Sequence, residues 1–241
     1  MINIIGTGNV ASHLYEAFRS KSDVKIINPH TLADLDPDCD LILICVKDNV
    51  IPEVAQKLRL HRDVNAIVVH TAGSVPMETL KDTSLKIGVF YPLQTFSKGI
   101  VLDYSRIPVF IEASSEDVAI KLEEFASLFS EQVKRADSKD RAILHLASVF
   151  ACNFTNAMAG IAHDILRESG LDYKVILPLM KQTVDKLLSL SPEEAQTGPA
   201  SRGDSEVIQA HLKMLENRPE IKDIYSTLSG IITAKTQGHE S

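Results

Sequence analysis

INIIGTGNVA, residues 2–11, is the stretch that decides the fold of this chain. Its first four residues predict a buried β-strand, and a helical pattern follows from residue 9 to residue 20. The G-x-G-x-x-A string between them is typical of a loop that holds a pyrophosphate at the N-terminus of a helix. Gly6 permits the tight turn, Gly8 lets the backbone approach the phosphates, and Ala11 keeps strand and helix close. The stretch therefore predicts a dinucleotide site, with contacts from Gly6, Thr7, Gly8, Asn9 and Val10.

Outward from this loop, short apolar strands alternate with helical or connecting segments. The expected strands are 2–5, 24–28, 41–46, 66–70, 85–91, 108–112 and 132–135, and the expected helices are 9–20, 49–58, 76–81 and 115–129. The connection between residues 28 and 41 is short and predicts a turn in place of a crossover helix. Such alternation predicts parallel pairing with right-handed crossovers. We expect an α/β fold, with a Rossmann-type, mostly parallel sheet followed by an all-α C-terminal domain.

From residue 138 onward the pattern is helical. Ser138 is expected to cap a helix that ends at Gly170, and further helices fit 172–190, 204–216 and 219–235. The first of these helices is apolar around its whole circumference, so it must be buried. A helical domain of about 100 residues cannot cover it alone, and we expect a homodimer. The predicted domains are a dinucleotide-binding domain, 1–136, and a helical dimerisation and substrate domain, 137–241.

Composition restricts the partners. The chain has 241 residues, 44% of them hydrophobic, and a formal net charge of −7. An acidic balance argues against a broad nucleic-acid or anionic-membrane surface, and uninterrupted apolar runs are much shorter than the roughly 18 residues of a membrane span. The three cysteines form neither a C-x-x-C pair nor a metal-type spacing with histidines. We expect a reduced, cytoplasmic protein without a metal and without a leader segment before the first strand.

The end of the second strand bears on the choice of cofactor. An NAD site usually has an acidic residue there for the ribose 2′-hydroxyl. Here the sequence is NPHT, residues 28–31, which has no acid and no arginine. We expect NADP, with NAD as the alternative, and contacts from Asn28, His30 and Thr31.

Three polar strings follow the next strands of the sheet, at the edge where open α/β sheets bind ligands. They are VKDN (46–49), HTAGS (70–74) and YPLQTF (91–96). Val46 and Lys47 are expected to contact the cofactor, although a capped turn explains the first string equally well. His70 is interpreted as an acid–base group, because a strand-end imidazole both donates and accepts protons. Ser74 and Gln94 are expected to bind substrate.

Five ordered strings together resemble a known family: GTGNVA (6–11), HTAGS, YPLQTF, HLASVFACNFTN (145–156) and TGPASRGD (197–204). The chain resembles NADP-oxidoreductase-like proteins with a Rossmann domain and a helical C-terminal domain of unknown function. This group is distantly similar to pyrroline-5-carboxylate reductase, ketopantoate reductase and the β-hydroxyacid dehydrogenases. The resemblance implies NADP binding, a homodimer and a substrate cleft between the domains, but no particular substrate.

The long helix departs from those distant relatives. The β-hydroxyacid enzymes carry a catalytic lysine four residues before an asparagine, and if Asn153 matches that asparagine, the lysine's place is Val149. A polar stripe remains, since His145, Cys152 and Asn156 align at about 100° per residue. Either His145 is the acid–base group and Asn153 orients the substrate, or the stripe is a hydrogen-bonded seam between helices.

The TGPASRGD string is expected to form a loop between helices. Arg202 suits bidentate binding of a carboxylate or phosphate, and Thr197 is expected to contact the substrate with it. Asp204 is expected to cap the next helix, and His211 either faces the same cleft or packs within the domain.

Three functions stay open from the sequence. The leading hypothesis is an NAD(P)-dependent oxidoreductase that acts on a small carbonyl, hydroxy-acid or imine substrate. The second is a dinucleotide-binding regulator without turnover, favoured by the missing lysine, and the third is a structural dimer with a vestigial glycine loop.

Overall fold

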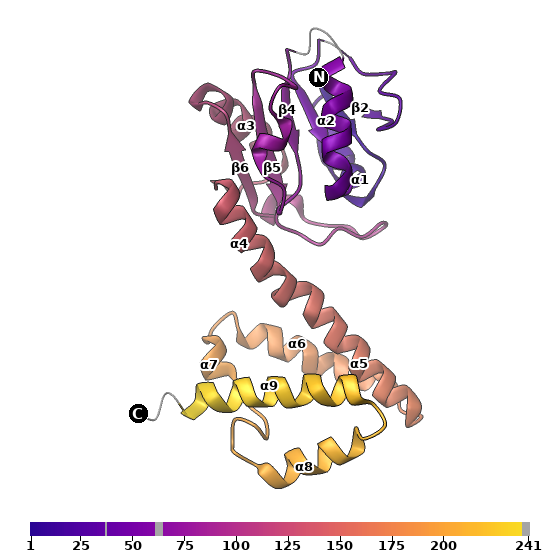
Figure 1. The fold of residues 1–241 in the computed structure, drawn as a ribbon, viewed down its shortest axis with the longest axis vertical. Coiled ribbons are helices and arrows are strands. Elements are labelled where there is room, and N and C mark those ends of the chain that lie inside the picture. The colour runs from indigo at the N-terminus through magenta and orange to yellow at the C-terminus, as the bar shows by residue number, and fades with distance from the viewer. Residues whose placement is uncertain (37, 61–64, 238–241) are drawn as a thin grey trace. The chain divides into compact units, whose positions relative to one another are not determined.

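The computed structural model describes residues 1–36, 38–60 and 65–237. The chain divides into two compact units, Met1–Phe154 and Thr155–Ser241. The first contains the β-sheet and the second is helical (Figure 1). The predicted limits of the dinucleotide-binding domain, 1–136, and of the helical domain, 137–241, differ from these two units and remain a prediction.

One seven-stranded sheet forms the centre of the first unit, in the order β2-β1-β3-β4-β5-β6-β7. Its strands are β1 (Ile2–Ile5), β2 (Val24–Ile27), β3 (Leu41–Ile44), β4 (Ile67–His70), β5 (Ile87–Pro92), β6 (Val109–Ala113) and β7 (Val133–Arg135). All neighbouring strands are parallel except β5 and β6. The Rossmann-type, mostly parallel α/β fold is therefore confirmed.

Two connections explain this topology. Between β2 and β3 the described residues form turns and no helix, as the short, aspartate-rich sequence predicts. Residues 93–108 connect β5 to β6 without crossing a face of the sheet, so β6 returns antiparallel beside β5. The segment that contains Gln94 consequently stays at the carboxyl edge of the parallel strands.

Helices cover both faces of the sheet. The helices α1 (Asn9–Phe18) and α3 (Glu116–Phe129) share a core with one face, and α2 (Ile51–Leu60) shares a second core with the other (Figure 1). Alternate residues of β1 supply the two cores, with Ile4 in the first and Ile5 in the second. This alternation follows from the two-residue period of a strand.

A long helix begins at the end of the sheet. It consists of α4 (Ser138–Ser148), a π-helical segment (Val149–Phe154) and α5 (Thr155–Glu168). The predicted cap is wrong by one residue, because the Asp137 side chain accepts a hydrogen bond from the Asp140 N–H while Ser138 is the first helical residue. Gly170 lies just beyond the helix with a φ of 70°, as expected for a C-terminal stop.

The helical unit continues after this stop with α6 (Leu177–Lys186), α7 (Pro192–Ala195), α8 (Ser205–Met214) and α9 (Pro219–Gln237). The helix expected over 172–190 is shorter than predicted, since a 3-10 turn at Tyr173–Ile176 precedes α6. Asp204 caps α8 by accepting a hydrogen bond from the Val207 N–H, which confirms that prediction.

Large apolar side chains on the long helix are exposed in the single chain. Ile143, Leu146 and Phe150 are each about 60% exposed. By length and composition the helix Ser138–Glu168 could also cross a membrane, a test that the core helix of a soluble protein passes as well. The helix is as apolar as the sequence predicts, and its own chain leaves much of it uncovered.

Candidate functional site

The carboxyl ends of four parallel strands lie at one level. The Gly6 N–H donates to the Ile27 carbonyl at 3.1 Å, the Cys45 N–H to Ile5 at 2.8 Å, and the Thr71 N–H to Ile44 at 3.3 Å. The loops after β1, β2, β3 and β4 therefore begin side by side. This is the edge at which the sequence places its candidate ligand-binding strings.

Gly6 is required by the fold itself. Its φ is +138°, a conformation that side chains rarely allow, and a Cβ there would lie 2.2 Å from the Cys45 carbonyl oxygen. The residue is buried between the ends of β1 and β3. A glycine at this position shapes the turn whether or not a ligand is bound.

Gly8 differs, because nothing in the protein demands a glycine there. Its φ is −79°, and a Cβ at this position would meet no atom within 4 Å. Gly8 is the exposed N-cap of α1 and makes no side-chain cap, so no cap side chain satisfies the first-turn N–H groups of the helix. This cradle fits a pyrophosphate, which binds helix N-termini through such N–H groups.

The other predicted cofactor contacts surround this loop. Asn28, His30 and Thr31 are exposed in a turn after β2, where the Asn28 side chain accepts a hydrogen bond from the His30 N–H at 2.8 Å. Lys47 is exposed at the start of the turn that leads into α2, and Val46 is half-buried. Thr7 is exposed, and Val10 packs against the core under α1.

Polar side chains also join neighbouring loops at this edge. Asn9 Nδ2 donates to the Phe96 carbonyl at 3.0 Å, which holds the YPLQTF segment, with its exposed Gln94, against the start of α1. Ser74 Oγ donates to Asp48 Oδ2 at 2.5 Å, which links the loops after β4 and β3. The structure thus brings Ser74 and Gln94 to the edge that carries the glycine loop.

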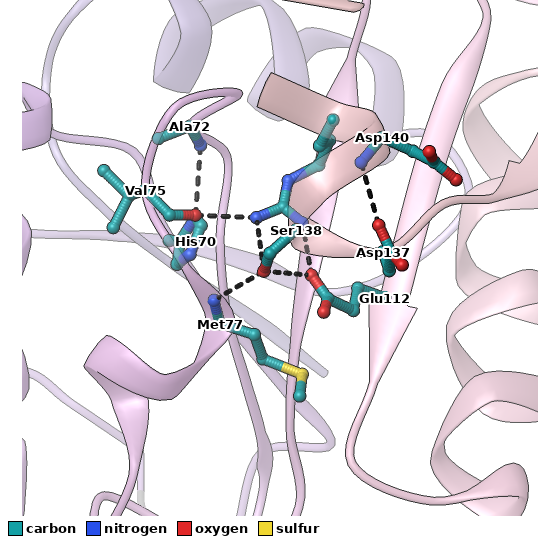
Figure 2. A network of polar contacts seen from close by, with 9 residues as sticks. His70, Ala72, Val75, Met77, Glu112, Asp137, Ser138 and Asp140 are labelled. Atoms are coloured by element: carbon teal, nitrogen blue, oxygen red, sulfur yellow. Dashed lines mark hydrogen bonds and ion pairs between the residues drawn. The ribbon is translucent and has the colours of Figure 1, made fainter. Parts of the chain in front are cut away.

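His70 lies below this edge, inside the protein. Its side chain has no exposed surface, and its Nδ1 accepts a hydrogen bond from the Ala72 N–H at 3.2 Å (Figure 2). Burial, reinforced by the nearby Arg141 cation, lowers the pKa of His70 to about 4. A neutral, enclosed imidazole cannot reach a substrate, so the interpretation of His70 as an acid–base group disagrees with its position. It shapes the HTAGS loop instead.

Arg141 fastens the start of α4 to the same region. Its guanidinium is fully buried and donates to Glu112 and, at 2.6 Å, to the Val75 carbonyl. Ser138 completes the network by donating to Glu112 at 2.8 Å and accepting from the Met77 N–H at 3.2 Å (Figure 2). Residues of β6, α4 and the loop after β4 are therefore held together by buried polar contacts.

This anchored helix brings His145 beside Tyr91. His145 Nδ1 and the Tyr91 hydroxyl are 3.3 Å apart, and the two rings meet edge-on with centroids 6.3 Å apart. Gly73 leaves room for the pair, because a Cβ there would lie 2.7 Å from Tyr91 and 3.0 Å from His145. Burial raises the pKa of the Tyr91 phenol, while a hydrogen bond with Ser148 acts in the opposite direction.

Tyr91 is a candidate site residue that was not predicted from the sequence. Tyr91 and His145 are 54 residues apart and come from different elements, so no local spacing reveals their contact. The available signal was the small residue of the HTAGS string at Gly73, which makes a close approach by another group possible.

The remaining predicted residues have less defined surroundings. Asn153 is exposed on the π-helical segment, where the 100° spacing that predicted the polar stripe of His145, Cys152 and Asn156 no longer applies. Thr197 and Arg202 are exposed in the helical unit. His211 Nδ1 lies 2.9 Å from the Tyr225 hydroxyl within that same unit, which is the packing alternative left open by the sequence.

Comparison with known families gives one match. Residues 107–232 match the family described as a domain of unknown function, DUF2520. A comparison with curated protein sequences gives no match.

Three solved structures share the whole fold. A protein from Bacteroides fragilis named as an NADP oxidoreductase is 39% identical, covers 97% of both chains and has a TM-score of 0.89. An imine reductase from Myxococcus stipitatus, solved with NADP⁺, is 16% identical over 99% of this chain and 94% of its own, with a TM-score of 0.66. A pyrroline carboxylate reductase from Plasmodium falciparum, solved with NADP, is 13% identical over 100% and 98%, with a TM-score of 0.60. The last two show the fold alone.

Proposed function

This chain belongs to the DUF2520 family and to the family of the Bacteroides fragilis protein, and we propose that it is an NADP-dependent oxidoreductase that reduces a small carbonyl or imine compound. Oxidation of the corresponding hydroxy acid is the reverse direction of the same chemistry. NADP is the proposed cofactor, with NAD as the alternative, because no acid follows β2 to repel a 2′-phosphate. The two NADP-bound neighbours support that choice.

One observation carries the proposal. The glycine loop is exposed at the carboxyl edge of the sheet, and nothing in the protein's own packing requires a glycine at position 8. The phenol–imidazole pair of Tyr91 and His145 lies at the same edge. The β1 and β5 strand ends are three strand spacings apart, on the order of 14 Å. An extended dinucleotide held at the glycine loop would therefore direct its other end towards Tyr91 and His145.

The reaction requires a proton as well as an electron pair. NADPH, when bound, supplies hydride to the electrophilic carbon of the substrate. Tyr91 is suited to donate its O–H proton to the carbonyl oxygen or imine nitrogen, because its hydroxyl already contacts an imidazole that can replace the proton. With Nδ1 protonated, His145 donates to the phenol oxygen and leaves the Tyr91 O–H free to point at the substrate.

Other residues have proposed supporting roles. Asn153 orients the substrate, and Ser74, Gln94, Thr197 and Arg202 contribute to its binding. His70 acts as a positioning residue, because its bond to the Ala72 N–H fixes the loop that precedes Gly73. The exposed polar residues Thr7, Asn9, His30, Thr31 and Lys47 are the proposed contacts of the cofactor.

A second copy of the chain is the proposed cover of the long helix. The exposed Leu146, Phe150 and Phe154 form an apolar surface on that helix. Exposure of such a surface to water is unfavourable in free energy, so burial against a second copy would stabilise it. The exposed Ile143 extends the surface towards the start of the helix. Light scattering should report a dimer at micromolar concentration, whereas a stable monomer or co-sedimentation with lipid vesicles would contradict it.

The test of the function is consumption of NADPH by the full chain with a panel of small ketones, 2-oxo acids and cyclic imines. Tyr91→Phe should lower kcat by about a hundredfold or more, as expected for removal of a general acid. NADPH affinity should be retained, because the glycine loop is untouched. Tyr225→Phe is the matched control, since it removes the hydroxyl of another Tyr–His pair, in the helical unit, and should leave turnover unchanged.

The alternatives are outcomes of the same experiment. NADPH binding without turnover across the panel would favour the regulator, which the apolar Val149 at the place of the relatives' lysine also favours. Absence of dinucleotide binding would leave a structural dimer.

A further inference from the structure

The turn after β2 has a fixed shape. The Asn28 side chain accepts from the His30 N–H at 2.8 Å, and the Asn28 carbonyl accepts from the Leu32 N–H at 3.1 Å. Leu32 is buried with a φ of 51° and anchors the turn in the core. Because Ile27 bonds to Gly6, this turn begins beside the glycine loop, where the ribose of a bound dinucleotide is recognised.

A cation from another element reaches this turn. Lys57 on α2 donates from Nζ to the Pro29 carbonyl at 3.4 Å and to Glu53 Oε1 at 2.8 Å. The Lys57 side chain is 32% exposed and that of Glu53 is 59% exposed. The bond from Lys57 lowers the pKa of the Glu53 carboxyl, with a smaller effect from His30 in the same direction. The Lys57–Glu53 pair thus lies next to the residues that are predicted to bind the ribose.

We propose that Lys57 is the cation that selects the 2′-phosphate of NADP, and that Glu53 holds Lys57 in place and opposes that phosphate. The inference rests on the proposed dinucleotide site and adds the residues that discriminate between NADP and NAD. Lys57 has a flexible stem and its ammonium lies at Pro29, next to His30, so the phosphate comes within its reach. His30 and Thr31 alone offer only an imidazole and a hydroxyl.

The pair can exchange partners at small cost. An exposed lysine–glutamate pair contributes little to stability because water and salt screen it. A phosphate monoester carries nearly two negative charges and accepts charge-assisted hydrogen bonds. Lys57 would therefore move from the carboxylate to the phosphate, and Glu53, left unpaired, would weaken NADPH binding by repulsion. The two residues should act on affinity in opposite directions.

The test is fluorescence titration of the full chain with NADPH and with NADH. Lys57→Met should weaken NADPH binding by about tenfold or more, the value of a charge-assisted hydrogen bond, and leave NADH affinity unchanged. Glu53→Gln should strengthen NADPH binding several-fold with no effect on NADH. Lys57→Arg should keep most of the NADPH preference, which shows that the charge and not the fold is responsible.

Arg59→Met is the matched control. It removes a positive charge from the same helix, but its guanidinium donates to the Lys81 carbonyl at 2.8 Å, away from the turn. The inference is overturned if the ratio of NADPH to NADH affinity changes equally in Arg59→Met and Lys57→Met, or in neither. Wild-type protein that binds neither dinucleotide would overturn the proposed function itself, and this inference with it. Wild-type protein that binds both cofactors, with no response to Lys57→Met, would overturn the inference alone.

Discussion

The two ends of the carboxyl edge use polar residues in opposite ways. At the glycine loop, Gly8 and the polar residues of the Asn28 turn are exposed to solvent, and a Cβ at Gly8 would meet no atom within 4 Å. At the other end His70 and Arg141 have no exposed surface and bond to the protein's own backbone and side chains. Buried polar groups that bond to the protein itself hold the fold, whereas exposed polar groups remain accessible to a ligand.

The largest predicted loss of stability is at the enclosed end of the edge, where His70 and Arg141 lie. Arg141→Met leaves Glu112, whose side chain is 14% exposed, without its cation and frees the Val75 carbonyl. The free energy of unfolding, measured by urea titration, should fall by about 3–5 kcal/mol, as for other broken buried ion pairs. Arg135→Met is the control, since Arg135 is 47% exposed in its pairs with Glu116 and Glu123 and its removal should lower the free energy of unfolding far less. Equal losses of unfolding free energy in Arg141→Met and Arg135→Met would contradict the distinction between buried and exposed ion pairs.

Within the glycine loop, the comparison separates two glycines. Gly6→Ala forces a side chain into positive φ and against the Cys45 carbonyl, so it should lower the free energy of unfolding by about 2–4 kcal/mol. Gly8→Ala meets no atom and should change stability by less than about 0.5 kcal/mol. The larger Gly8→Val should abolish NADPH binding in a protein that melts normally. Unchanged affinity in that variant would exclude the loop as the phosphate site.

The smallest of the three predicted losses of stability comes from the titration of His70. Its folded pKa of about 4 lies below the ordinary value of 6.5, so the neutral form stabilises the fold above pH 6.5. As pH falls from 6.5 towards 4, His70 becomes protonated in the unfolded chain but stays neutral in the folded chain. The free energy of unfolding should therefore fall by about 2–3 kcal/mol. His70→Asn should lose less over the same range, measured by urea titration at several pH values. The exposed His30→Asn should follow the wild type, and identical slopes for all three proteins would reject the enclosed-histidine interpretation.

The sequence by itself determined the local structure. The strand, the glycine turn and the helix of residues 2–11 predict their own geometry, because backbone freedom and hydrophobic period are properties of neighbouring residues. The same holds for the order of the strands and helices and for the Asp204 cap. Each of these follows from residues a few positions apart.

Only the tertiary structure decided which polar residues meet. Tyr91 and His145 are 54 residues apart, and Lys57 is 28 residues from Pro29. The lowered pKa of His70 follows from its burial and from the nearby Arg141 cation, which a distant segment of the chain, the helix α4, supplies. The π-helical turn at Val149–Phe154 likewise changed the face on which Asn153 lies. Such contacts arise from packing between segments that are distant in the sequence, so the spacing of residues along the chain does not predict them.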